Sequence, residues 1–110
     1  MSLDIWLYYP SATTEGTDAT VIDLNITHNL TPMWRLAGCY DALYMSVDRE
    51  ARTISPALEE AVRRMKVDPA AYVALNPPNG WGSYEDALPW LERLLVACKA
   101  HPSAIVGVSK

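Results

Sequence analysis

The sequence contains no phenylalanine, only two cysteines and no long apolar run, and these absences exclude several classes of protein. Cys39 and Cys98 are isolated and form no CxxC pair, so they favour two buried free thiols in a reducing compartment over a zinc site. No segment approaches the roughly 20 apolar residues of a membrane span. The first residues show no basic segment followed by an apolar one, as a signal peptide would. We therefore expect a cytoplasmic protein that makes no membrane contact.

Basic residues are also scarce. Nine Lys and Arg residues stand against thirteen Asp and Glu residues, which gives a net charge of −4, and Arg63, Arg64 and Lys66 form the one basic cluster. A protein that binds the phosphate backbone of a nucleic acid needs a basic face. The charge distribution therefore argues against nucleic-acid backbone binding.

The chain does have the composition of an ordinary globular domain. Its 110 residues are enough for one domain with a modest core. Four Trp and six Tyr supply all of the aromatic bulk, and their N–H and O–H groups need hydrogen-bond partners when buried. Such side chains suit a plain core and equally a core that opens onto a partly hydrated site.

Hydrophobic periodicity predicts three strands and three or four helices. The strands are expected over residues 3–9, 20–27 and 104–108, and the first two should pair as a hairpin with a long loop over residues 11–19. Capping residues followed by proline or acidic residues predict helix starts at residues 31, 55, 68 and about 86. The predicted fold is a single α+β domain over residues 1–110, with a small antiparallel sheet of about three strands in the order ββαααβ.

Three details of the predicted helices depend on single residues. Gly38 lies within the helix expected from Thr31 to Tyr44, and we expect it to allow close packing without breaking that helix. A charged connector is expected over residues 46–53. Pro89 suits a first helical turn better than a helix interior, which favours a start near Asp86 for the last helix.

The first candidate site is the segment Asn25-Ile-Thr-His-Asn29, at the end of the second predicted strand. Strand ends that lead into helices are common positions for functional residues. Backbone N–H groups at the following helix start could hold an anion. His28 is of the type most often used as an acid or base near neutral pH. The competing interpretation is a structural histidine that bonds a loop carbonyl.

The second candidate site is the segment from Asn76 to Glu85, in which two prolines and two glycines exclude regular structure before the last helix. Trp81 between two glycines is either a plug over the core or a platform on which a planar ring stacks. In the second case Trp81 and Tyr84 could sandwich the ring while Asn76, Asn79 and Glu85 hold its edge. The predicted ligand-binding residues are Asn25, Thr27, His28, Asn29, Tyr40, Asn76, Asn79, Trp81, Tyr84 and Glu85.

Metal and cofactor motifs are missing from the chain. Asp23, Asp41, Asp48 and His28 are of the types that bind divalent metals, but their spacing matches no HxH, HExxH or DxD pattern. There is also no Walker A loop, no GxGxxG and no GxSxG. We expect neither a metal nor a cofactor.

A wider pattern connects the two sites, and it consists of Asn25-Ile-Thr-His-Asn-Leu30, Met33, Ala37-Gly38-x-Tyr40, Asn76-Pro-x-Asn-Gly-Trp-Gly-x-Tyr-Glu85, Pro89-Trp90 and Val108-Ser109. This pattern resembles a family of small uncharacterised proteins encoded by bacteria and bacteriophages, over nearly the whole chain after the first loop. The resemblance implies a compact cytoplasmic protein and supplies no activity. The chain departs from the family pattern after Leu43, where Tyr44-Met45-Ser46 replaces a Trp-Arg-Pro-like element.

Three functions fit these observations. A binding protein for a small planar, nucleotide-like ligand or a host protein partner is favoured, because no catalytic signature is present. The alternative is a small enzyme in which His28 is the general acid or base, with Glu85 or Asp23 orienting it and Asn29 or backbone N–H groups stabilising negative charge. The third is a structural protein that self-associates through a strand edge or an apolar helix face. The oligomeric state does not follow from the sequence.

Overall fold

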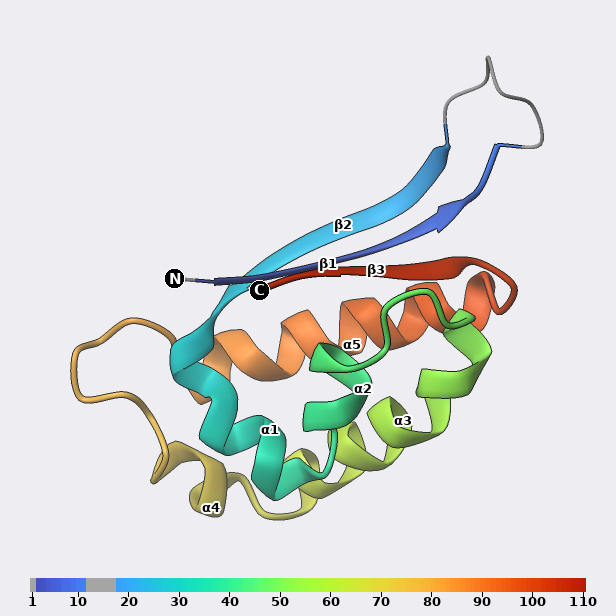
Figure 1. Ribbon diagram of the computed structural model, residues 1–110. Coiled ribbons are helices and arrows are strands. Elements are labelled where there is room, and N and C mark those ends of the chain that lie inside the picture. The colour runs from blue at the N-terminus through green and yellow to red at the C-terminus, as the bar shows by residue number, and fades with distance from the viewer. Residues whose placement is uncertain (1, 12–17) are drawn as a thin grey trace.

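The fold packs a small antiparallel sheet on a layer of helices. The computed structural model describes residues 2–11 and 18–110, so most of the predicted loop over residues 11–19 lies outside the described residues. Strands β1 (Ser2–Tyr9), β2 (Ala19–Thr27) and β3 (Ile105–Ser109) lie in the order β2-β1-β3. The central β1 pairs antiparallel with both neighbours. Figure 1 shows the helices gathered on one side of this sheet.

All three predicted strands are confirmed. A strand with one buried face alternates apolar and polar residues, and this pattern is visible in the local sequence. Leu3, Ile5 and Leu7 of β1 are fully buried, whereas the residues that alternate with them are only half-buried. In β2 the same alternation buries Leu24 and Ile26. Successive side chains of a strand point to opposite faces, so these residues line the face that meets the helices.

Over the described residues, five α-helices follow β2, which corrects the expected three or four. They are α1 (Thr31–Ala37), α2 (Tyr40–Tyr44), α3 (Ala51–Val67), α4 (Pro69–Val73) and α5 (Tyr84–Ala100), and a short 3₁₀ turn, η1 (His28–Leu30), precedes α1. The long helices α3 and α5 lie side by side beneath the sheet (Figure 1). Between them and β1 lies the core, to which Leu58, Leu91 and Leu94 contribute. The α+β class is therefore confirmed.

Gly38 ends the helix that we expected to continue to Tyr44. Its φ angle is 82°, a left-handed conformation that glycine adopts at low cost, and its N–H bonds the carbonyls of Trp34 and Arg35. The chain turns at this point and resumes as α2. Leu36, two residues before this glycine, is 49% exposed. The same glycine can pack inside a helix or end one, and the local pattern does not distinguish the two cases.

Two helices begin earlier than the sequence predicted. α3 starts at Ala51, inside the expected connector, because the Ala51 N–H bonds the carbonyl of Ala104 at 2.8 Å and the Arg52 N–H bonds that of Pro102 at 3.0 Å. These tertiary bonds satisfy N–H groups that a capping side chain would otherwise satisfy. α5 starts at Tyr84, where Ser83 accepts a hydrogen bond from the Asp86 N–H. Pro56 and Pro89 consequently lie inside their helices.

Cys39 and Cys98 are buried free thiols, as predicted. Burial raises the pKa of each thiol to about 12, so both are protonated at neutral pH. None of the helices in the described part of the chain combines the length and the apolar character that crossing a membrane requires.

Candidate functional site

The two polar motifs of the sequence meet at the end of β2. Asn29 donates a hydrogen bond from Nδ2 to the backbone carbonyl of Trp81, with 3.3 Å between the atoms. Gly82 approaches so closely that an added Cβ would lie 2.7 Å from Cγ2 of Thr27 and 3.1 Å from Cδ2 of Leu30. Figure 1 shows the loop between α4 and α5 returning to the turn that follows β2. We call this surface, formed by residues 27–30 and 76–84, the Trp81 junction.

Two asparagine side chains fix the shape of the loop in the Trp81 junction. Oδ1 of Asn79 accepts a hydrogen bond from the Trp81 N–H at 3.0 Å, and Oδ1 of Asn76 accepts one from the Tyr84 N–H at 2.8 Å. Gly82, with φ of 98°, supplies the left-handed turn that follows Trp81. The side chain of Trp81 remains in solvent, because the residue is 71% exposed. This exposure overturns the interpretation of Trp81 as a plug over the core.

Tyr84 faces the body of the protein. Its hydroxyl donates a hydrogen bond to the carbonyl of Met65 at 2.7 Å, and its ring stacks on that of Tyr72 with centroids 6.2 Å apart. Tyr84 therefore joins the start of α5 to α3 and α4. Its ring is engaged by the fold, so the expected sandwich with Trp81 has only one of its two walls.

His28 belongs to an aromatic cluster with α2. Its Nδ1 lies 2.8 Å from the hydroxyl of Tyr44, whose ring stacks on that of Tyr40 with centroids 4.6 Å apart. The guanidinium carbon of Arg35 lies 4.0 Å from the centre of the Tyr40 ring. His28 and Tyr40 are among the predicted ligand-binding residues, whereas Tyr44 is not, although side chains four residues apart on a helix share one face.

The Tyr44 hydroxyl is a neutral partner for His28. Burial raises the pKa of Tyr44, and a hydrogen bond with Thr31 opposes that rise. The hydroxyl therefore keeps its proton at neutral pH, and either donates to Nδ1 or accepts from it according to the tautomer of the ring. The hydroxyl orients the imidazole and is itself uncharged.

The carboxylates that the sequence offered as partners of His28 lie in other settings. Among the described residues, the hydrogen bond of the His28 ring goes to Tyr44, and none goes to a carboxylate. Glu85 is exposed in the first turn of α5, where a carboxylate stabilises the helix dipole. Asp23 lies on β2 opposite Trp6 of β1.

Asn25 and Thr27 are used within the local structure. Nδ2 of Asn25 donates to Oγ of Ser2 at 2.9 Å and to Oδ1 of Asp4 at 2.8 Å, and this network lies on neighbouring strands. Oγ1 of Thr27 accepts a hydrogen bond from the Asn29 N–H and caps η1. Trp81, in contrast, combines a fixed backbone with a side chain that is exposed to solvent.

The residues that the structure describes contain no group of three or more His, Cys, Asp or Glu that could hold a metal ion. Comparisons with protein-family models, with curated proteins and with solved structures find no match for the chain. The family resemblance of the two motifs therefore stays a prediction.

Proposed function

We propose that the protein is a small cytoplasmic binding protein, encoded by a bacterium or a phage, and that it contacts its partner through the Trp81 junction. The observation that carries this proposal is an indole that is 71% exposed on a loop whose backbone is held by side chains of Asn29, Asn76 and Asn79. Tryptophan is enriched among the residues that contribute most to protein interfaces. A loop that is already ordered loses little conformational freedom on binding.

A host protein suits this surface better than an enclosed small ligand. Figure 1 shows the loop between α4 and α5 projecting from the body of the molecule. An indole on such a loop can enter a cavity of the partner. A planar, nucleotide-like ligand would stack on Trp81 alone, because Tyr84 is stacked on Tyr72. We therefore infer a protein partner, and we make the planar ligand an outcome of the test.

The enzyme hypothesis has less support from the geometry. A general acid or base is usually oriented by a second polar group and placed within reach of a substrate. His28 has the Tyr44 hydroxyl as its neighbour. No carboxylate joins that pair among the described residues, so we do not extend the proposal to catalysis.

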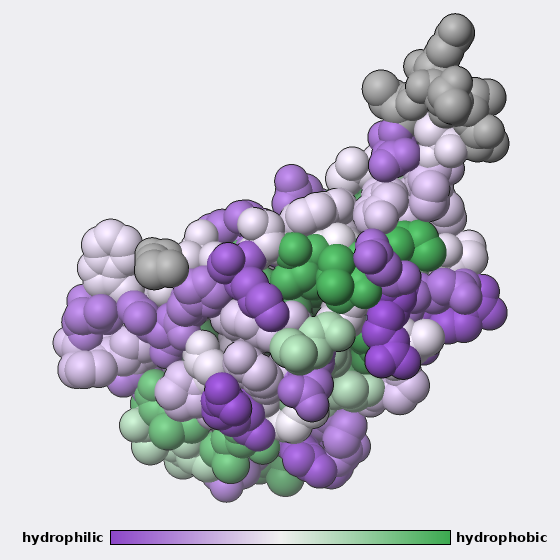
Figure 2. Space-filling view, viewed as in Figure 1, coloured by the Kyte–Doolittle hydropathy of each residue, from purple (hydrophilic) through white to green (hydrophobic). Residues whose placement is uncertain are grey.

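The test presents the full-length chain to a displayed library of random peptides and measures the selected peptides against two variants. Trp81→Ala removes the exposed indole. Val73→Ala is the matched control, because Val73 is 44% exposed on α4. Figure 2 shows further apolar side chains gathered over α4 and the neighbouring ends of α1 and α3, where Leu36 and Val67 are exposed. We expect Trp81→Ala to weaken peptide binding by about tenfold or more, and Val73→Ala to leave it unchanged.

Equal binding of the peptides to both variants would contradict the proposal. ATP and GTP are titrated in parallel by calorimetry. If either nucleotide binds the wild-type chain and not Trp81→Ala, the junction holds a planar ligand and the inference of a protein partner is wrong.

The outer edge of β2 supports a second candidate function, which is self-association. No strand of the described residues pairs with that edge. Beside it lies an apolar hollow between β2 and α5, lined by Val21, Ile22 and Val96 among others. An unpaired edge beside apolar surface is a place where a second copy can add its own strand. Light scattering tests this function: a dimer that Ile22→Lys disrupts would favour it, and a monomer at high concentration would argue against it.

A further inference from the structure

One face of the sheet carries no helix. Figure 1 shows every labelled helix on the opposite side, where the apolar residues of β1 are buried. The residues that alternate with them point to the uncovered face, and Trp6 lies at the middle of this set, opposite Asp23 on β2 and Gly107 on β3. We call the surface around Trp6, which includes Asp4, Asp18, Asp23, Asp48 and Gly107, the Trp6 face.

The indole of Trp6 rests on the sheet at Gly107. A Cβ added to Gly107 would overlap Cε2 and Nε1 of the ring, so the ring lies directly over the backbone of β3. Trp6 is half-buried, and Gly107 is buried. A ring that is already held by the fold loses little conformational freedom when a partner covers its exposed part. Trp6 is therefore a preformed aromatic surface on an otherwise open face.

Two hollows adjoin Trp6, one toward the start of β1 and one toward its end. Their volumes are about 440 Å³ and 300 Å³, large enough for a long side chain and within the range of about 300–1,000 Å³ that is typical of ligand sites. Asp4 and Asp23 line the first, and Asp18 and Asp48 line the second. No lysine or arginine of the described residues lines either hollow. Each hollow thus presents two carboxylates and no opposite charge.

The four carboxylates of the Trp6 face have no cationic partner in the described part of the chain. The ion pairs found there all involve glutamates. Asp4 accepts a hydrogen bond from Nδ2 of Asn25 at 2.8 Å, and Asp18 accepts one from the Ser11 N–H at 2.7 Å, so both of these donors are neutral. Gathered charges of one sign repel each other, and a cationic ligand would relieve that repulsion.

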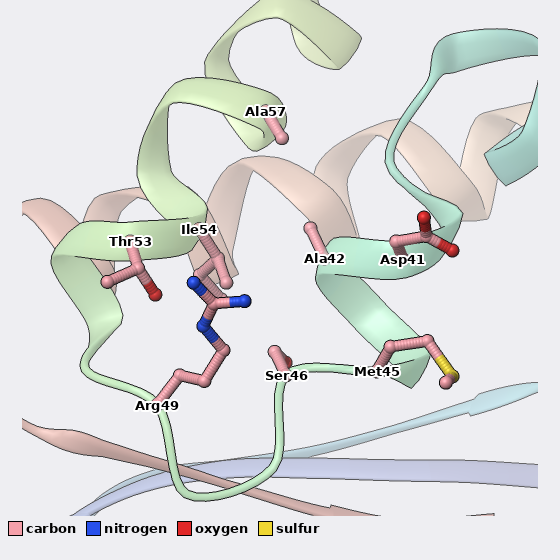
Figure 3. A pocket seen from close by; sticks show the side chains of 8 residues that line it. All are labelled: Asp41, Ala42, Met45, Ser46, Arg49, Thr53, Ile54 and Ala57. Carbon is pink, nitrogen blue, oxygen red and sulfur yellow. The ribbon is translucent and has the colours of Figure 1, made fainter.

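Asp48 is held beside the sheet although it lies in the connector between α2 and α3. Its N–H donates a hydrogen bond to the carbonyl of Val106 on β3 at 2.8 Å. Figure 3 shows this part of the connector, between Ser46 and Arg49, passing against the strands. In the same view the side chain of Arg49 rises away from the strands toward α3, so the neighbouring positive charge is directed away from the Trp6 face.

We propose that the Trp6 face docks a basic segment of a partner protein, with two arginine side chains that enter the hollows beside Trp6. Each guanidinium contacts the carboxylates of its hollow, because its planar set of donors matches a carboxylate with two parallel hydrogen bonds. The arginine stems and guanidinium planes lie against the indole, whose ring attracts cations. The site uses no residue of the Trp81 junction, so it is independent of the binding function proposed above.

The test titrates the full-length protein by calorimetry with two capped peptides of glycine and serine that each contain two arginines. The arginines are separated by one residue in the first peptide and by three in the second, since such residues share a face of an extended chain. Control peptides carry citrulline, the uncharged analogue of arginine, at both positions. Putrescine supplies two positive charges without a peptide. We expect at least one arginine peptide to bind about tenfold more tightly than its citrulline control and than putrescine.

NMR shifts of backbone amides locate the binding surface, and they should centre on the three strands and on Asp48. The proposal is overturned if the citrulline peptides bind as tightly as the arginine peptides, if no peptide binds, or if the shifts lie elsewhere. Putrescine that binds as tightly as both arginine peptides would mean that the face takes a free polyamine, and would overturn the choice of a protein segment.

Two substitutions remove one carboxylate from each hollow. Asp23→Asn and Asp48→Asn should each weaken the better peptide by about three- to tenfold. Asparagine adopts a left-handed conformation readily, so it suits the φ angle of 68° at Asp48. Asp68→Asn is the matched control, because Asp68 is an exposed aspartate between α3 and α4, in the helical layer. It should leave the affinity unchanged, and an equal loss in Asp68→Asn would show that the peptide responds to net charge alone.

Asp23→Asn also has a readout that does not depend on a ligand. Since Asp23 lies near other carboxylates and forms no ion pair within the described ranges, its neutralisation should leave the melting temperature unchanged or raise it by up to about 2 °C. A fall of more than about 4 °C would show that Asp23 already has a partner within the protein, and that result would also overturn the proposal.

Discussion

Trp90 on α5 and Trp81 on the loop before it both make a hydrogen bond near the end of β2, but the fold uses the two side chains in opposite ways. Trp90 is 7% exposed, and its Nε1 donates to the carbonyl of Asn25 at 3.1 Å while its ring packs on that of Trp34 with centroids 5.6 Å apart. Trp81 is 71% exposed, and its backbone carbonyl joins it to the strand end by accepting a hydrogen bond from Asn29. The buried indole stabilises the fold, whereas the exposed one contributes surface that a partner can cover.

The largest expected difference is in stability. Trp90→Ala should lower the free energy of unfolding by about 3–5 kcal/mol, because it removes buried apolar surface and leaves a cavity. Trp81→Ala should change it by no more than about 0.5 kcal/mol, as for an ordinary surface site. Urea denaturation followed by circular dichroism measures both values. Comparable losses in the two variants would show that Trp81 is part of the core, and would remove the contrast.

The two glycines beside Trp81 provide a second comparison. Both have positive φ, 75° at Gly80 and 98° at Gly82, so alanine at either position should cost about 1–2 kcal/mol of stability. At Gly82 the new methyl group would also meet Thr27 at 2.7 Å, whereas at Gly80 nothing lies within 4 Å. Gly82→Ala should therefore be more destabilising than Gly80→Ala, by about 1–3 kcal/mol. Equal losses would mean that the loop does not dock on the strand end.

These contrasts show how far the sequence alone can predict this molecule. The strands follow from the alternation of apolar and polar residues, and the buried faces of the helices follow from the helical period of apolar residues. Both patterns are local properties of the sequence. The start of α3 does not follow from a local pattern, because it depends on bonds from Ala51 to Ala104 and from Arg52 to Pro102, which lie far away in the chain. Gly38 is a similar case, because the residues around it fit both a glycine packed inside a helix and a glycine that ends one. The packed structure decides between these two roles.

The candidate sites were predictable only as residue types. The sequence identified the segments that contain Asn29 and Trp81, but whether they touch depends on how the loop after α4 returns to β2.

Cys98 reports on the region of Trp90, because both residues lie on α5. Burial raises the pKa of Cys98 and of Cys39 to about 12, from an ordinary value of 9.0. Both thiols should therefore react with DTNB at pH 8 only as fast as the protein opens. Rapid reaction of Cys98 in the native state would show that α5 is less firmly packed than the contrast requires.

Ionisation of the same two thiols should lower the stability of the protein at alkaline pH. A pKa that is raised on folding means that the unfolded state releases its proton first. The stabilisation is therefore complete below pH 9.0 and declines as the pH rises toward about 12. Urea midpoints measured from pH 8 to pH 11 should decline, and Cys98→Ala should reduce the decline.

The smallest expected effect concerns the exposed ion pairs of Glu60. Hydrogen bonds from Arg63 and Arg64 lower the pKa of Glu60 to about 2, from an ordinary value of 4.5. A lowered pKa gives stability above pH 4.5 that is lost as the pH falls toward 2. The group is accessible to water and salt, so Glu60→Gln should have a slight effect that 1 M NaCl, with a Debye length of about 3 Å, abolishes. A large effect that resists salt would indicate a more buried cluster than the structure shows.

The central claim is that Trp81 is exposed and yet held in place before any partner binds. NMR relaxation of the full-length protein tests it most directly, through the order parameter of the Trp81 backbone N–H and the solvent exchange of its indole N–H. We predict an order parameter of about 0.85, as in rigid backbone, together with rapid exchange of the indole proton. A value below about 0.6, as in flexible segments, or an indole proton protected from exchange, would contradict the account.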